Sequence, residues 1–197
     1  MTMQLPKSIR DNLRFLCVEI DSQVANLQNY FVTPSVTNAR RILNRSGYAY
    51  NLKTRIHDSC LSKLARCKEG SAETLTLRGV EFVATNLERI AELCRDCIKQ
   101  MEHLTDMKSL KPEAYTPMLD RVKRGIELVE PAIQNNDTRL ALKIGQIEGK
   151  LDRDYNKLQK HYIAELKQKK YTENLTNALF VAHSVEQMGD ALLDISE

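Results

Sequence analysis

A stretch of this chain occurs twice, and the repeat constrains the fold more than any local pattern does. Residues 82–92, FVATNLERIAE, return as residues 180–190, FVAHSVEQMGD, with Phe, Val, Ala and the first Glu unchanged. Repetition at half the chain length indicates two similar halves that fold in the same way. We therefore expect two domains, residues 1–107 and residues 108–197.

The repeat keeps a pair of carboxylates four residues apart. Glu88 and Glu92 in the first copy correspond to Glu186 and Asp190 in the second. Like charges at this spacing repel each other on a helix by about 0.2–0.5 kcal/mol. Because both copies keep the pair, we expect an interaction that compensates for the repulsion.

The composition excludes several classes of protein. The net charge is +3, which is too small to indicate a nucleic-acid partner. No stretch approaches the roughly 20 apolar residues of a membrane span, and the N-terminus lacks the layout of a secretory signal. The five cysteines are odd in number and scattered, which favours a reduced, cytosolic setting. We interpret the Cys94/Cys97 pair as buried or half-buried thiols, with redox or metal chemistry as the alternative.

Apolar spacing predicts six helices and no strand. The helices are expected over residues 8–30, 37–67, 72–103, from Pro112 to a kink or end near Pro131, 138–167, and 172 to the end. Gly47 weakens the middle of the second helix and could allow close packing there. Three helices can close into an antiparallel bundle with short loops. The predicted fold is therefore all-α, with two three-helix bundles in tandem.

Narrow bundles each bury a limited core, which favours association between chains. We expect Phe31, Tyr48, Tyr50 and Tyr115 to be exposed and to serve the interface of a homodimer or higher oligomer. The alternative is that these aromatic side chains close the bundle core.

The carboxylates gather along one predicted groove. On a helical wheel Glu186 and Asp190 border the apolar stripe of their helix, with His183 one turn earlier. The preceding helix carries Glu148 and Asp152 at the same spacing. Because these two helices are neighbours in a bundle, the two pairs should face each other. Oxygen ligands of this kind suit hard cations, Fe or Mn, and His183 at the edge would suit Zn or Fe.

A solvated face lined with salt bridges explains the same pattern, and spacing alone favours it. Cations are close in the sequence to each pair: Arg89, Arg95 and Lys99 in the first half, and Lys150 and Arg153 in the second. In the first half, the helix expected to face Glu88 and Glu92 carries no matching carboxylate pair. Metal binding is therefore predicted more strongly for the second half.

Enzyme signatures are missing from the chain. It has no Glu-x-x-His signature of di-iron bundles, no Gly-rich phosphate loop, no Gly-x-Ser-x-Gly elbow and no His-Glu-x-x-His. We therefore predict that the protein is not an enzyme.

Residues 86–92, NLERIAE, and residues 185–197, VEQMGDALLDISE, resemble the repeated signature of the PhoU family of phosphate-uptake regulators. That signature reads Leu-Glu-Arg-Ile-Gly-Asp followed by a run similar to Asn-Ile-Ala-Glu. Here Glu-Arg-Ile survives in the first copy and Gly-Asp in the second. The expected architecture, two three-helix bundles in tandem, is also that of the family.

The resemblance implies a cytoplasmic, non-enzymatic regulator, peripheral to the membrane at most, that binds metal ions and acts on a phosphate transporter and a sensor kinase. It assigns metal binding to Glu88 and Glu92, to Glu186 and Asp190, and to the pair Glu148 and Asp152. The first copy departs from the signature at Ala91 and Glu92, and Asn51 stands where a carboxylate would be expected.

Two other functions remain open at this point. The chain could be the soluble cytoplasmic part of a phosphate cotransporter, since the same domain can be joined to membrane segments. It could also be a metal-dependent enzyme on a helical bundle. An upstream membrane region in the gene would favour the first, and phosphoester turnover with Mn²⁺ would favour the second.

Overall fold

A computed structural model describes residues 5–168 and 170–197 of the chain, and every regular element in that part is helical. The first half contains α1 (Lys7–Val32), α2 (Val36–Leu43), α3 (Ser46–Leu64) and α4 (Ala72–Glu102). The short 3₁₀ helix η1 (Met107–Leu110) leads into the second half, with α5 (Pro112–Asn135), α6 (Thr138–Leu166) and α7 (Thr172–Ser196). The all-α prediction is confirmed, and the expected helix ranges agree closely for all but the second helix.

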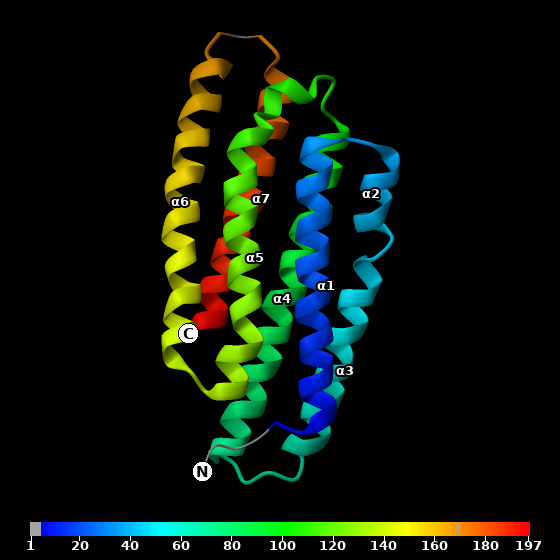
Figure 1. Cartoon of the computed structure of the whole chain (residues 1–197), viewed down its shortest axis with the longest axis vertical. Coiled ribbons are helices and arrows are strands. Elements are labelled where there is room, and N and C mark those ends of the chain that lie inside the picture. Colours follow the sequence, from blue (N-terminus) through cyan, green and yellow to red (C-terminus); the bar gives the residue numbers. More distant parts are fainter. Residues whose placement is uncertain (1–4, 169) are drawn as a thin grey trace.

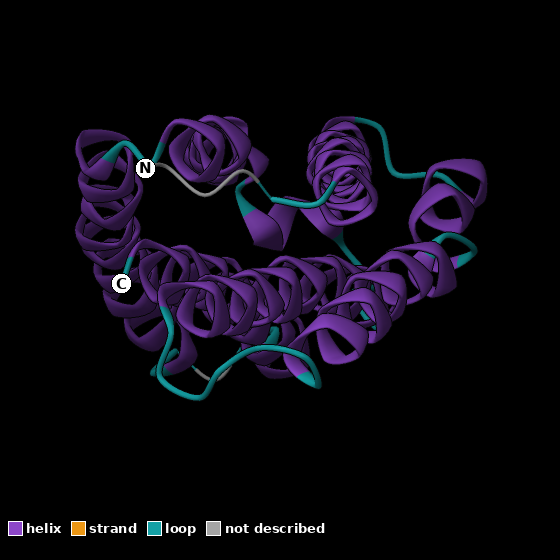
Figure 2. Ribbon diagram, turned by 90° about the horizontal axis from the view of Figure 1, so that it is seen from below, coloured by secondary structure: helices purple, strands orange, loops and turns teal. Residues whose placement is uncertain are grey.

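The helices lie roughly parallel to the long axis of the molecule (Figure 1). In each half three helical rods pack together, with α2 and α3 forming one broken rod, and the halves meet where α4 packs on α7 and α1 packs on α5. Figure 2 shows α6 and the α2–α3 rod at the two outer sides of this arrangement. The buried apolar side chains of all these helices form one continuous core across both halves.

The second predicted helix is broken into α2 and α3 at Asn44 and Arg45, contrary to the single helix expected over residues 37–67. At this break Arg45 forms an ion pair with Glu19 of α1, and its Nε donates a hydrogen bond to Glu19 Oε1 at 3.0 Å. Glu19 is only 2% exposed, so leaving it unpaired would be costly.

The close packing expected at Gly47 is wrong. A Cβ added to Gly47 would meet nothing within 4 Å.

Two of the four aromatic residues expected at an interface lie in the core instead. Phe31 and Tyr115 are 2% and 0% exposed, and their rings stack with centroids 4.7 Å apart. Tyr48 and Tyr50 are exposed, as expected. The prediction is wrong for the first pair because α5 packs on α1, and Phe31 of α1 stacks on Tyr115 of α5 at this contact.

Buried polar groups tie the end of the second bundle together. The Tyr115 hydroxyl donates to the Ala178 carbonyl at 3.0 Å and lies 3.1 Å from the Tyr162 hydroxyl. Tyr162 in turn donates to the Leu110 carbonyl at 2.8 Å. This chain of hydrogen bonds satisfies hydroxyls that would otherwise be costly to bury. No helix in the described residues is long and apolar enough to cross a membrane.

Candidate functional site

Helices α6 and α7 are in close contact at Gly189. A Cβ placed on Gly189 would lie 2.9 Å from Leu151 Cδ1 and 3.5 Å from the Cα of Glu148. Glycine therefore permits a contact that a larger residue would hinder. The approach places the backbone of Glu148 next to Gly189, within the Glu186–Asp190 turn of α7.

Glu186 is the most constrained carboxylate at this contact. Its Oε2 atom is buried and accepts no hydrogen bond from the described residues, although His183 Nδ1 lies 3.2 Å away. This contact is an ion pair only when the imidazole of His183 is protonated. Burial raises the pKa of Glu186, and the charges of Asp190 and Asp152 raise it further, while His183 opposes the shift. The carboxylate thus lies near two like charges, with His183 as its ion-pair partner among the described residues.

Asp152 and Tyr155 of α6 face the same region. The Tyr155 ring lies 5.9 Å from the His183 ring, and burial with the charge of Glu186 raises the pKa of the phenol. Within the part of the chain that the structure describes, no ion pair joins Asp152, Asp190 or Glu148 to a lysine or arginine. The cations Lys150 and Arg153, which a solvated face would use, are exposed.

The carboxylates are near enough to influence each other electrostatically, but they do not form one cluster of ligands. In residues 5–168 and 170–197, no three histidine, cysteine, aspartate or glutamate side chains stand together as a finished metal site. The charges of Asp152, Asp190 and His183 nevertheless act on the pKa of Glu186, across the contact of α6 and α7. A buried carboxylate whose nearest partner is a histidine, and which lies near two like charges, is a group that a cation would stabilise.

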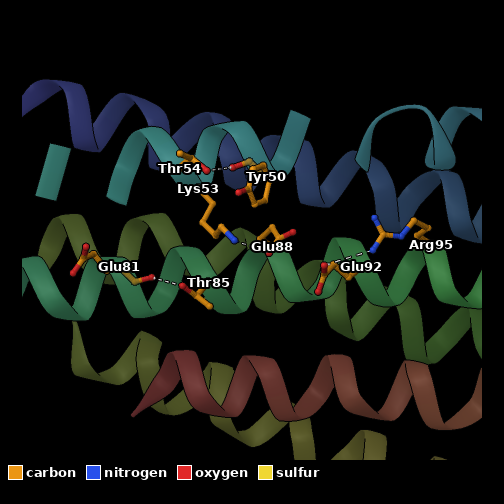
Figure 3. Close-up of polar contacts among 8 residues, drawn as sticks. All are labelled: Tyr50, Lys53, Thr54, Glu81, Thr85, Glu88, Glu92 and Arg95. Carbon is orange, nitrogen blue, oxygen red and sulfur yellow. Dashed lines mark hydrogen bonds and ion pairs between the residues drawn. The ribbon is translucent and has the colours of Figure 1, made fainter. Parts of the chain in front are cut away.

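The first half is built differently around the equivalent glutamate. Glu88 is 8% exposed, and its Oε2 lies 3.2 Å from Lys53 Nζ (Figure 3). The Lys53 side chain reaches over from α3 and also holds its ammonium 4.6 Å from the centre of the Tyr50 ring. This distance is within the range of a cation–π contact. Glu88 is therefore already neutralised by a side chain of the protein.

Glu92 does not join Glu88. It is exposed and pairs with Arg95 on the same helix at 3.5 Å, one turn along α4 (Figure 3). Two turns before Glu88, Glu81 Oε1 lies 2.8 Å from His57 Nδ1. A cavity of about 320 Å³ opens beside these groups, lined by Tyr50, Lys53, Thr54, His57, Glu81, Ala84 and Thr85.

Sequence reasoning missed Lys53 and Tyr155. Lys53 follows the buried Ala49 by four residues and precedes the buried Ile56 by three, so it borders the apolar stripe of α3. That position is a signal, because a lysine at the edge of a stripe can lay its stem along the core and bring its charge to a neighbouring helix. Tyr155 likewise follows the buried Leu151 by four residues.

The comparisons with known proteins agree with the fold. The sequence model of the PhoU domain matches residues 13–101 and 116–197. No curated protein sequence matches the chain. The crystal structure of PhoU from Pseudomonas aeruginosa is 17% identical with a TM-score of 0.84, covering 95% of this chain and 91% of that one. The phosphate transport system regulatory protein PhoU from Streptococcus pneumoniae is 18% identical with a TM-score of 0.86, covering 96% and 90%.

Proposed function

Because the chain belongs to the PhoU family, whose domain model matches both of its halves, we propose that it regulates phosphate transport. The double match carries this proposal, since it spans most of the chain. The similar Streptococcus pneumoniae structure is that of a phosphate transport system regulatory protein. The protein acts in the cytoplasm and does not catalyse a reaction. It binds a phosphate transporter component, a sensor kinase or both.

We further propose a metal seat in the second half, between α6 and α7. Asp152, Glu186 and Asp190 supply the oxygens, with Glu148 and His183 at the edges. Support comes from the buried Glu186 Oε2, which has no lysine or arginine partner among the described residues, and from the two carboxylates that raise the pKa of Glu186. A bound cation would reverse that field, and the side chains of Asp152 and Asp190 would turn toward Glu186.

The donor set favours Fe, Zn or Mn over Ca²⁺. Calcium takes six to eight oxygens, usually from a flexible loop that wraps the ion. Straight helices present fewer ligands at fixed spacing, which suits ions of lower coordination number, and an imidazole favours Zn or Fe. The bound ion would join α6 to α7 without a rearrangement of the fold.

Melting curves test the metal seat. We expect Mn²⁺ or Zn²⁺ to raise the Tm of the native protein, because a ligand that binds only the folded state stabilises it. The double variant Glu186→Gln, Asp190→Asn should lose this response. As a matched control, Glu92→Gln should keep it, because Glu92 is exposed and pairs within its own helix. An equal shift in all three proteins would show non-specific binding and reject the seat.

A separate experiment tests the regulatory role. Deleting the gene in the organism that encodes it should leave phosphate-starvation genes expressed in medium rich in phosphate, and the native gene should restore repression. Unchanged expression after deletion would contradict the proposal.

We also propose that the protein forms a homodimer or higher oligomer. Light scattering tests this: a mass of 22.6 kDa at every concentration would exclude it.

A further inference from the structure

The two repeat-equivalent glutamates are neutralised in different ways. Glu186 Oε2 lies 3.2 Å from His183 Nδ1, it has no lysine or arginine partner among the described residues, and it is near two further carboxylates. Glu88 occupies the same place in the first copy of the repeat, yet its Oε2 lies 3.2 Å from an ammonium group. The same acidic position therefore faces a histidine and two carboxylates in one half and a lysine ammonium in the other.

We infer that Lys53 is the built-in counter-ion of the first half and that it closes this half to metal ions. The ammonium stands beside Glu88 where a divalent cation would have to bind. A metal ion there would be repelled by the ammonium, or would have to displace it from both Glu88 and the Tyr50 ring. Binding of metal is thus confined to the second half, and each chain takes one ion.

The packing of Lys53 supports a fixed role rather than a chance surface contact. Its side chain is 24% exposed and that of Glu88 is 11% exposed, so the pair is largely removed from water. Breaking such a pair leaves an uncompensated buried charge, whereas removing both partners does not. The Arg95–Glu92 pair on the same helix is more exposed, at 28% and 49%, and provides a matched comparison.

A metal-free double-mutant cycle tests the counter-ion role by itself. Urea unfolding in the presence of a chelator is measured for the native protein, Lys53→Met, Glu88→Gln and the double variant. Lys53→Met alone should lower the folding equilibrium constant by about tenfold or more, and adding Glu88→Gln should restore most of the loss. The matched cycle of Arg95→Met with Glu92→Gln should show little coupling. Additive effects of Lys53→Met and Glu88→Gln would overturn the inference.

Metal stoichiometry tests the closure of the first half. This part rests on the proposed metal seat, and it is read by calorimetric titration with Mn²⁺. The native protein and Glu88→Gln should each bind one ion, and Glu186→Gln should bind none. A second ion in the native protein that is lost in Glu88→Gln would overturn the inference. If the native protein binds no ion, the metal seat fails, and the metal-free cycle still decides the role of Lys53.

Discussion

At the scale of single residues, the buried tyrosine network explains why Tyr115, predicted at an interface, is in the core. Tyr115 gains a hydrogen bond to the Ala178 carbonyl and a second contact to the Tyr162 hydroxyl. A phenol with both needs met can be buried with little loss, while its ring adds apolar area.

Tyr115→Phe should therefore lower the free energy of unfolding by about 1–3 kcal/mol, because Tyr162 loses a buried partner. Urea denaturation gives this value directly. Tyr48→Phe is the control, since Tyr48 is exposed and should change stability by less than about 0.5 kcal/mol. Equal effects of the two substitutions would show that the buried network contributes nothing specific.

Glu186 predicts a dependence of stability on pH. Its pKa in the folded protein is raised above the ordinary 4.5 by burial and by Asp190, so the folded state keeps this proton over a range where the unfolded chain has released it. The protonated Glu186 therefore contributes its full stabilisation of the folded state below the pKa of the unfolded chain. This stabilisation is lost as the pH rises through the pKa of the folded protein.

In metal-free buffer, Glu186→Gln should accordingly be more stable than the native protein near about pH 7 and no more stable near about pH 4. Thermal melts at both values give the comparison. Glu127→Gln removes an exposed glutamate of α5 and should show no such pH-dependent gain. A gain for Glu186→Gln that is the same at both pH values would contradict the assignment.

At the scale of helices, glycines with and without close neighbours should respond to alanine in opposite directions. A Cβ on Gly125 of α5 would lie 2.7 Å from Leu192 Cδ1 and 3.0 Å from Ile147 Cδ1. Gly125→Ala should thus cost about 1–3 kcal/mol in overpacking. A Cβ on Gly79 of α4 would meet nothing within 4 Å, so Gly79→Ala should gain up to about 1 kcal/mol. Denaturant unfolding of both variants checks the contrast; a gain in both would mean that α5 and α7 separate easily.

Helix positions could be predicted because apolar residues recur at helical spacing along the chain, and a long amphipathic stripe leaves few alternatives. The break between α2 and α3 could not, because it accompanies a distant partner, the buried Glu19 on α1. The same periodicity predicts that the carboxylates of the candidate site border the apolar stripes of α6 and α7. The lysine beside Glu88 was not, since which helix a long side chain reaches depends on packing that one sequence does not display.

At the scale of the whole molecule, one core crosses both halves. Helix α4 of the first half packs on α7 of the second, and an ion pair between Arg89 and Asp194 spans them at 3.8 Å. The halves are alike in sequence, yet neither covers its inner face alone. We expect the entire chain to unfold in a single transition, with a calorimetric enthalpy equal to the van't Hoff enthalpy. Two resolved transitions would show that residues 1–107 and 108–197 are energetically separate.

Buried thiols near the α4–α7 contact can report how often the two halves of the protein separate. Cys94 and Cys97 are fully buried, Cys97 Sγ lies 3.9 Å from the Val181 carbonyl oxygen of α7, and burial raises the pKa of both thiols far above its ordinary value. A thiol reagent can reach them only when the halves part, whereas the partly exposed Cys67 is open to it at any time. The rate at which the native chain becomes labelled at Cys97 therefore counts how often its two halves separate, and a ligand that joins them would slow that rate.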